Sequence, residues 1–401
     1  MIFIDEIYKI VQCLDCFIFL RFFYHDDCIH HQIQLEKRIR KLGIVFIKLA
    51  QWYASFSQEK EKNWYQICMK FQTQSYPPHP FPFHLRNHPF FRENNEMDWK
   101  NDVDCIASGS IGTVYRINQY AIKIQHPWVL QEFRVFTRIF QKLQWILWWF
   151  QKSIPMHEFY DLLEGQFDFR REAENLDMYH RLYQKESPYI IFPKVYYVEK
   201  TILITEYIPP FCYENTERRH QEQEKLERYL LLKCWVLDQI MVKRVFHGDL
   251  HEGNWSFTEK GIVIYDFGYV FHLDTFSKEL YSDMLSNNPI LISKALLCLF
   301  DMDMKHQPKI IEWIKKFKGQ DEHQEVDSSS KYSLVLEILK QFIFQKMILM
   351  NRRLFFLFNL MMIMKTIHKS LPFFYNNSFQ SCYFLLQKKN ILDELKQQML
   401  L

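Results

Sequence analysis

The sequence predicts an α+β fold in which a helical N-terminal extension precedes a β-rich lobe and then a helical lobe. Apolar residues recur at three- and four-residue steps between Leu42 and Tyr53, as they do on one face of a helix. Short β-rich runs follow beyond residue 102, and long helical stretches return after Pro209-Pro210. We therefore expect three parts, which span residues 1–100, 101–210 and 211–401.

The first two parts have clear start and stop signals. Residues 31–60 are predicted to be helical, and YPPHPFPF (76–83) breaks any helix because each proline removes a donor and restrains its predecessor. TVYRI and YAIKI predict a hairpin around Asn118-Gln119. IIFPKVYYV and TILITEYI predict a second hairpin around Glu199-Lys200, and residues 157–182 between the two pairs are predicted to be helical.

In the third part, a long helix is expected from ENTERRHQEQEKLERYLLLKCWVLDQIM, followed by a loop at HGDLHEGN (247–254) and a strand at GIVIYDFG that ends in a turn. Residues 318–331 are polar and predict an exposed loop, and the rest is predicted to be helical. Two apolar runs, Ile7 to Phe23 and Leu354 to Met364, are expected to be buried core helices. The second run has 11 residues, whereas a spanning helix needs ~20. Peripheral membrane contact stays open for the first.

Composition excludes several classes of protein. With 48% hydrophobic and 17% aromatic residues, the chain of 401 residues can bury a sizeable core. The net charge of +3 without a long basic run does not indicate nucleic-acid binding. The nine cysteines are irregularly spaced, so we expect reduced thiols, and Cys13 and Cys16 form a lone C-x-x-C without the four ligands of a zinc site. The start, MIFIDEIYK, does not resemble a secretory or transit peptide, so an intracellular location is expected.

Three short segments contain most of the glycines and suggest phosphate chemistry. Gly109, Gly112, Gly248, Gly253 and Gly268 are five of only nine glycines, and they lie where backbone must turn sharply or approach a ligand. HGDLHEGN and the following DFG place Asp249, Asn254 and Asp266 at the spacing that phosphoryl transfer uses to hold Mg²⁺ and to orient a nucleophile. The joint pattern predicts a phosphoryl-transfer site, whereas DFG alone would be weak.

A lysine and a carboxylate upstream fit the same chemistry. Lys123 lies between Ile122 and Ile124 and eleven residues after Gly112, so it is either a solvated strand residue or a contact to the α- and β-phosphates. Glu172 is the candidate partner. It shares a helix face with Asp168 and Asn175, and the alternative is a charged solvent face paired with Arg170 or Arg171.

The ordered motifs of residues 40–280 resemble the UbiB/ABC1/ADCK (AarF-type) atypical kinases. GIVFIKLAQWYAS resembles the K-x-G-Q helix of that family, and CMKFQTQSYPPHPF resembles the proline-bearing segment after it. ASGSIGTVYR resembles the alanine-rich loop, AIKIQHP the lysine strand and QFDFRREAEN the E-x-D helix, while FHGDLHEGNW and IYDFGYV match the catalytic and metal loops. Ala50 stands where the family has glycine, and Gln166 stands where it has the first acid of E-x-D.

The resemblance implies a two-lobed protein-kinase-like fold and a role for each matching residue. Lys48 and Gln51 would reach the nucleotide site, Glu206 to Ile208 would hold adenine, and Lys123 would contact phosphates while paired with Glu172. Asp249 would be the catalytic-loop carboxylate, and Asn254 and Asp266 would bind Mg²⁺. The remaining expected nucleotide contacts are those of the small-residue loop, Ala107, Ser108, Gly109, Ser110 and Gly112. This loop is intermediate between the alanine-rich and glycine-rich forms, so a preference for ATP or ADP does not follow.

The expected function is therefore that of an atypical kinase-like ATPase that binds Mg-ATP and supports coenzyme Q (ubiquinone) or isoprenoid-lipid metabolism. The family also implies quinone precursors or lipid as partners, with a mitochondrial or membrane-associated location, and leaves a homodimer open. Two alternatives remain. One is a small-molecule phosphotransferase of the aminoglycoside/choline kinase type, whose catalytic loop also reads HGDLHxGN. The other is a catalytically weak nucleotide- or lipid-binding scaffold.

Overall fold

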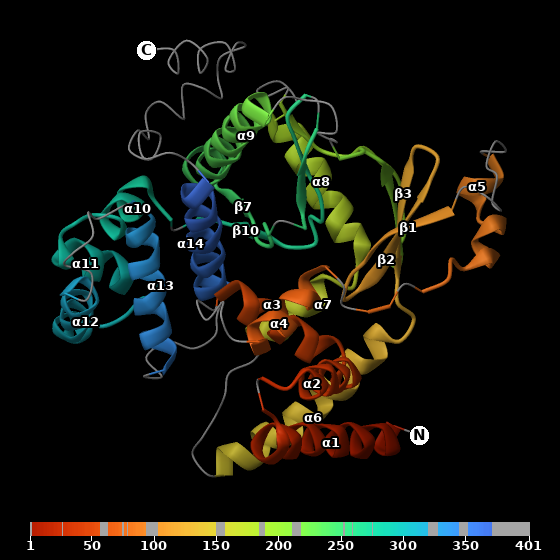
Figure 1. Ribbon diagram of the computed structural model, residues 1–401, viewed down its shortest axis with the longest axis horizontal. Coiled ribbons are helices and arrows are strands. Elements are labelled where there is room, and N and C mark those ends of the chain that lie inside the picture. Colours follow the sequence, from red (N-terminus) through yellow and green to blue (C-terminus); the bar gives the residue numbers. More distant parts are fainter. Residues whose placement is uncertain are drawn as a thin grey trace. The chain divides into compact units, whose positions relative to one another are not determined.

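The computed structural model (Figure 1) describes residues 2–25, 27–56, 63–73, 76–77, 79–93, 103–149, 157–183, 189–210, 218–251, 253–258, 260–274, 276–319, 328–344 and 352–370. They form two compact units. The first unit is Met1–Ala173 with Lys194–Tyr207, and the second is Glu174–Pro193 with Ile208–Leu401. Helices and a mainly antiparallel sheet occur together, so the predicted α+β class is confirmed.

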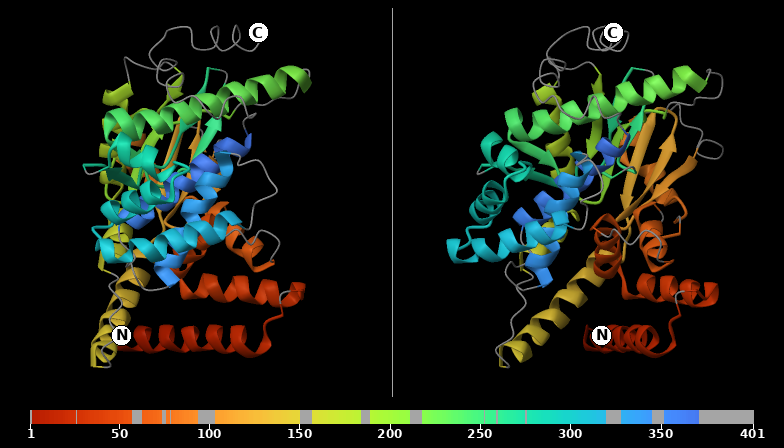
Figure 2. Two further views of the ribbon diagram at one scale, coloured as in Figure 1. Left: turned by 90° about the vertical axis from the view of Figure 1, so that its left-hand side faces the viewer. Right: turned by 60° about the vertical axis from the view of Figure 1, so that its left-hand side comes forward.

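The first unit begins with helices. Their bounds are α1 (Ile2–Ile18), the π-helix η1 (Phe19–Phe23), α2 (Ile29–Leu42), α3 (Ile44–Phe56) and α4 (Asn63–Thr73). Over residues 31–56, the continuous helix predicted for 31–60 is two helices, because Gly43 between α2 and α3 has a φ of 92°; residues 57–60 lie outside the described residues. Figure 2 shows α1 and α2 side by side, and the two helices contact each other.

The exposure of α1 corrects one expectation. The prediction that Ile7 to Phe23 is a buried core helix is wrong, since Phe17 is 64% exposed and Phe22 is 68% exposed. Only one face, which includes Cys16 and Phe19, is buried. The physical reason is that α2 and α6 (Val129–Trp149) cover a single side of this helix.

A five-stranded antiparallel sheet forms the β-rich part of the first unit. The strands are β1 (Val103–Ser108), β2 (Gly112–Ile117), β3 (Tyr120–Gln125), β5 (Val195–Val198) and β6 (Ile202–Glu206), in the order β1-β2-β3-β6-β5. The hairpin predicted around Asn118 is confirmed, with Asn118 at a φ of 53° as a tight turn requires. The second predicted hairpin is confirmed as the pair β5–β6.

The first unit also contains short and long helices that follow the N-terminal ones in the sequence. They are η2 (Phe83–Asn87), α5 (Pro89–Glu93), α6, α7 (His157–Gly165) and the start of α8 (Phe169–Tyr183). Residues 76, 77 and 79–82 are not helical, as the prolines predict. Phe81 and Phe91 pack with Tyr115 and Ile122 in one core cluster, so this segment covers part of the sheet.

The second unit contains short strands beside long helices. The strands are β4 (Ile190–Ile191), β7 (Val245–His247), β8 (Trp255–Phe257), β9 (Ile262–Ile264) and β10 (Val270–His272). The strand β7 pairs with β10 in an antiparallel manner, whereas β9 pairs with β8 in an antiparallel and with β4 in a parallel manner. The predicted long helix is present as α9 (Arg218–Asp238), which continues into the π-helix η3 (Gln239–Lys243).

The remainder of the second unit is helical, as predicted. Its elements are α10 (Lys278–Met284), α11 (Pro289–Leu299), η4 (Met304–His306), α12 (Gln307–Gly319), α13 (Ser328–Phe344) and α14 (Arg352–Ser370). The apolar run from Leu354 to Met364 lies on α14 and is largely buried, which confirms the core-helix prediction. Residues 320–327 of the predicted polar loop lie outside the described residues, whereas residues 318–319 end α12 and residues 328–331 begin α13, so the loop prediction is wrong at both ends. Among the described helices, none combines the length and the apolar character that crossing a membrane requires.

Candidate functional site

An ion pair in the first unit joins a lysine of β3 to a glutamate of α8. The Nζ atom of Lys123 lies 2.9 Å and 2.8 Å from the two carboxylate oxygens of Glu172. The side chains of Lys123 and Glu172 are only 17% and 8% exposed, so the pair is largely shielded from water. Lys123 therefore is not an ordinary solvated strand residue, although the alternation of β3 alone allowed that interpretation.

The two other residues of the predicted face, Asp168 and Asn175, have other partners. Asp168 lies just before α8 and forms a bidentate ion pair with Arg170, at 2.8 Å and 2.5 Å. The hydrogen bond from Arg170 lowers the pKa of the Asp168 carboxyl. Further along the helix, the Nδ2 atom of Asn175 donates to the carbonyl of Phe267 at 2.8 Å. Glu172 is therefore the residue of the predicted helix face that pairs with Lys123.

The predicted small-residue loop is the turn between β1 and β2. The backbone N–H of Gly109 donates to the carbonyl of Gly112 at 2.9 Å, which closes the turn. The Oγ atom of Ser108 donates to the carbonyl of Pro77 at 3.5 Å. A Cβ added to Gly112 would collide with the backbone of Ile124, so glycine is required there by close approach of β3. Ser110 is buried, while Ala107 is exposed and pairs with β2.

His126 forms hydrogen bonds to the backbone of this turn. Its N–H donates to the carbonyl of Ile111 at 2.9 Å, and its Nε2 lies 3.2 Å from the carbonyl oxygen of Gly109. The ring is 2% exposed and stacks on Trp128 with a centroid distance of 4.9 Å. Burial lowers the pKa of the imidazole, so the neutral ring donates through Nε2. Its position in AIKIQHP, one residue after β3, was the available sequence signal, but no role was predicted for it.

The remaining predicted nucleotide contacts of the first unit are dispersed over it. Lys48 of α3 is buried, and the amide of Gln51 donates to the carbonyl of Phe71 in α4 at 2.6 Å. Glu206 ends β6, and its carboxylate accepts from the N–H of Lys194 at 3.4 Å. Gln166, at the position of the missing acid, is buried between α7 and α8. The amide of Gln51 therefore contacts the helical extension.

In the second unit, hydrogen bonds to backbone groups connect the predicted catalytic and metal residues. The Nδ2 atom of Asn254 donates to the carbonyl of Asp249 at 2.8 Å, and the N–H of Tyr265 donates to the carbonyl of Asn254 at 2.8 Å. Asp266 follows directly with a φ of 52°, and its Oδ1 accepts from the N–H of Gly268 at 3.3 Å. The hydroxyl of Tyr265 also donates to the carbonyl of Ile208 at 3.1 Å.

His247 links the two loops, and sequence reasoning assigned it no role. Its Nε2 lies 3.0 Å from the carbonyl of Tyr265, and its Nδ1 accepts from the N–H of Asp249 at 3.3 Å. Gln239 accepts from the N–H of His247 at 2.9 Å and from the hydroxyl of Tyr179 at 2.7 Å. Complete burial lowers the pKa of His247, so a neutral imidazole donates to one loop and accepts from the other.

The donor set of these loops fits a magnesium ion. Mg²⁺ prefers hard oxygen ligands from carboxylates and amides. The carboxylate of Asp266 is exposed, and Asn254 uses its Nδ2 for the bond to Asp249, which leaves Oδ1 to act as an acceptor. Asp266 and Asn254 are therefore the residues that would hold the ion, with Asp249 in the same loop as the nearby carboxylate.

Comparison with known proteins identifies the family. Residues 93–292 match the profile described as the ABC1 atypical kinase-like domain. The chain belongs to the ABC1 family. The Arabidopsis thaliana Protein ACTIVITY OF BC1 COMPLEX KINASE 8, chloroplastic, is 24% identical over 260 residues, which cover 58% of this chain and 33% of that protein.

Two further known proteins are similar to this chain. Protein ACTIVITY OF BC1 COMPLEX KINASE 1, chloroplastic, also from Arabidopsis thaliana, is 26% identical over 270 residues, or 62% of this ABC1 family chain and 39% of that protein. The matched part therefore spans 33% and 39% of the length of these two relatives. The Rv3197–erythromycin complex from Mycobacterium tuberculosis aligns with a TM-score of 0.42 and 18% identity, over 68% of this chain and 75% of that one.

Proposed function

We propose that this ABC1 family member binds Mg-ATP and transfers its terminal phosphoryl group, with water as the first acceptor. The observation that carries the proposal is the shielded ion pair between Lys123 and Glu172. A lysine on a strand next to a small-residue turn, held by a helix carboxylate, is the arrangement that kinase-like proteins use to contact the α- and β-phosphates.

The residues would divide the chemistry as follows. Lys123 binds phosphate oxygens, and the turn from Ala107 to Gly112 approaches the phosphates with its backbone. Asn254 and Asp266 provide oxygen ligands, and Mg²⁺, when bound, neutralises charge on the phosphates. Asp249 orients the attacking water or hydroxyl. Backbone groups from Glu206 to Ile208 would hold adenine.

The helical extension belongs to the same proposal. Lys48 and Gln51 lie on one face of α3 at the positions of the family's K-x-G-Q motif, with Ala50 in place of glycine. We infer that they act on the nucleotide site, and the amide of Gln51 in this structure is engaged with α4. The connection with coenzyme Q or isoprenoid-lipid metabolism rests on family membership, and so does a location at a membrane.

The test uses the purified full-length chain with Mg-ATP. We expect phosphate release that increases when quinone-like phenols and vesicles containing phosphatidylglycerol are added. Lys123→Met should abolish nucleotide binding, and Lys194→Met is the matched control because Lys194 is exposed and lies just before β5 of the same unit. Stoichiometric phosphorylation of a small alcohol or aminoglycoside would instead identify a small-molecule phosphotransferase. Nucleotide binding without turnover would identify a scaffold, and equal binding by both variants would contradict the role of Lys123.

A further inference from the structure

The first helical segment carries an unusual concentration of exposed apolar side chains. Ten of the seventeen large hydrophobic side chains that are exposed in the described part of the chain lie on α1 and η1. They include Phe17, Phe22 and Phe23, which are 64%, 68% and 58% exposed. Exposed patches of this kind mark interaction surfaces in soluble proteins. The nucleotide chemistry proposed above uses none of these residues.

A cavity of about 290 Å³ lies under this segment, within the first unit. Its nine lining residues come from α1 and η1, from α2 and from α3. Small-molecule pockets begin at roughly 300 Å³, and an apolar cavity of about 150 Å³ already accepts benzene. The volume is therefore sufficient for a segment of hydrocarbon chain.

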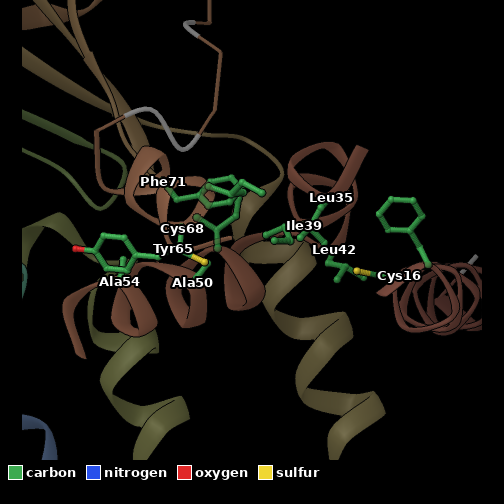
Figure 3. Close-up of a cluster of buried hydrophobic side chains, with 12 residues drawn as sticks. Cys16, Leu35, Ile39, Leu42, Ala50, Ala54, Tyr65, Cys68 and Phe71 are labelled. Carbon is green, nitrogen blue, oxygen red and sulfur yellow. The ribbon is translucent and has the colours of Figure 1, made fainter. Parts of the chain in front are cut away.

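The cavity and the exposed face share residues. Phe17 and Leu20 line the cavity and are also 64% and 41% exposed. Figure 3 shows Cys16 of α1 pointing toward Leu42 of α2, and both residues line the same cavity. The cavity therefore opens through the apolar face of α1 and η1.

The lining excludes most polar occupants. None of the nine lining side chains carries an oxygen or nitrogen atom, and the only polar atoms among them are the thiols of Cys13 and Cys16. Burial raises the pKa of Cys16 to about 11 and also raises the pKa of Cys13, so both thiols stay uncharged. A peptide backbone or a nucleotide placed here would lose its hydrogen bonds to water without replacement. A hydrocarbon chain needs no such partner.

The surroundings of the mouth suit the surface of a bilayer. The guanidinium of Arg21 lies 5.5 Å from the ring of Phe22. That of Arg38 lies 4.1 Å from the ring of Phe19 but is paired with the carboxylate of Asp15 at 3.0 Å, so Arg21 is the cation offered to headgroups. Amphipathic helices at membrane interfaces combine large apolar residues with nearby cations, which meet the phosphate layer. This places charge where headgroups would lie and apolar atoms where chains would lie.

We propose that α1 and η1 lie in the interface of a phospholipid bilayer and that the cavity takes up one hydrocarbon chain of a membrane lipid. The inference deepens the lipid connection of the proposed function. Lipid uptake by this cavity involves no nucleotide. The lipid experiment can therefore fail while nucleotide binding is confirmed, and nucleotide binding can fail while lipid uptake is confirmed.

Thiol alkylation of the unaltered full-length chain tests the proposal. The protein is mixed with vesicles of phosphatidylcholine and phosphatidylglycerol, flotation measures binding, and N-ethylmaleimide labelling is followed residue by residue by mass spectrometry. We expect vesicles to slow the labelling of Cys13 and Cys16 at least fivefold. The exposed Cys105 of the same unit and the exposed Cys298 are internal controls whose labelling should not change.

Four results would overturn the proposal. One is absence of flotation, and another is flotation that leaves the labelling of Cys13 and Cys16 unchanged. A third is protection that grows with protein concentration without lipid, because a second copy of the chain would then cover the face. The fourth is protection by monomeric dihexanoylphosphatidylcholine below its micelle concentration but not by vesicles, because the ligand would then be a free lipid.

A matched pair of double variants separates the cavity from the helix face. Phe17→Asp with Leu20→Asp places carboxylates at the cavity mouth, whereas Ile7→Asp with Val11→Asp places them on exposed positions that do not line the cavity. We expect vesicle affinity to fall at least threefold further in the first variant than in the second. Equal losses in the two variants would contradict a role for the cavity.

Discussion

The ammonium group of Lys123 lies within 2.9 Å of both carboxylate oxygens of Glu172, although 49 residues separate the two along the chain. The two side chains are mostly shielded from water, and the aromatic ring of Phe169 lies 5.2 Å from the same ammonium group. A charge pair in such a place keeps its geometry because neither member can exchange its partner for water. Substitutions in this pair can therefore be tested in separate experiments for their effect on stability and on the proposed nucleotide binding.

Removing one member of this pair should destabilise the protein more than removing both. Glu172→Gln leaves Lys123 without its counter-charge, and breaking a pair of this kind costs roughly 3 kcal/mol. The double variant Lys123→Met with Glu172→Leu should recover at least half of that loss. Urea unfolding of the three proteins measures it, and a double variant less stable than Glu172→Gln would contradict the assignment.

Acid should weaken the fold through two buried histidines. His126 and His247 both have a pKa below the ordinary 6.5 because burial disfavours the charged ring. The unfolded chain therefore takes up protons first, and stability is lost as the pH falls below 6.5, by up to about 1.4 kcal/mol per pH unit for each ring. The free energy of unfolding between pH 7.5 and 5 measures this slope.

The matched comparison uses His126→Asn and His84→Asn, since His84 is exposed. The first variant should be less sensitive to acid than the unaltered protein, and the second should have the unaltered slope. Equal slopes in all three proteins would show that His126 does not contribute.

His126 should also affect nucleotide affinity without touching the nucleotide. Its bond to the carbonyl of Gly109 positions the turn that we propose to approach the phosphates. His126→Ala should raise the Kd for Mg-ATP about tenfold, which corresponds to ~1.4 kcal/mol. His126→Gln, which keeps a donor, should restore part of the affinity. Isothermal titration at pH 7.5 provides the measurement, and unchanged Kd in His126→Ala would exclude a positioning role.

The two glycines of the turn should respond differently to alanine. At Gly112 a new Cβ would lie 3.0 Å from the carbonyl carbon of Ile124 and closer still to its oxygen, whereas at Gly109 the nearest atom is an ordinary 3.5 Å away. Gly112→Ala should therefore cost about 1–3 kcal/mol of stability, as overpacking does. Gly109→Ala should change it by less than about 0.5 kcal/mol. Thermal unfolding of the two alanine variants and of the unaltered protein measures this difference in stability.

The proposed metal site predicts a specific loss. Asp266→Asn keeps the shape of the side chain but removes the charge that would hold Mg²⁺. We expect Mg²⁺-dependent nucleotide binding and hydrolysis to be abolished, measured as the affinity for ATP with and without Mg²⁺. Asp274→Asn, at an exposed position after β10, should behave as the unaltered protein. Unchanged affinity and turnover in Asp266→Asn would refute the metal assignment.

Much of the local structure follows from residue patterns that act over short range. The alternation around Lys123 and the turn at Asn118 predict the β2–β3 hairpin, and the prolines from Pro77 on predict the absence of helix, because both depend on neighbours in the chain. The limit of such reasoning is visible at Gly43. Periodicity predicted one helix across it, and the positive φ that divides α2 from α3 carries no periodic signal.

The sequence by itself determined the secondary structure around the candidate site, the spacing of Asp249, Asn254 and Asp266, and the family. Only the tertiary structure decided that Glu172 pairs with Lys123 rather than with Arg170 or Arg171, and that His126 and His247 support the loops. It also decided that the apolar residues of α1 face outward above a cavity. The physical reason is that pairing and burial depend on which surfaces meet across long stretches of chain, whereas motifs and periodicity report only on neighbours in sequence.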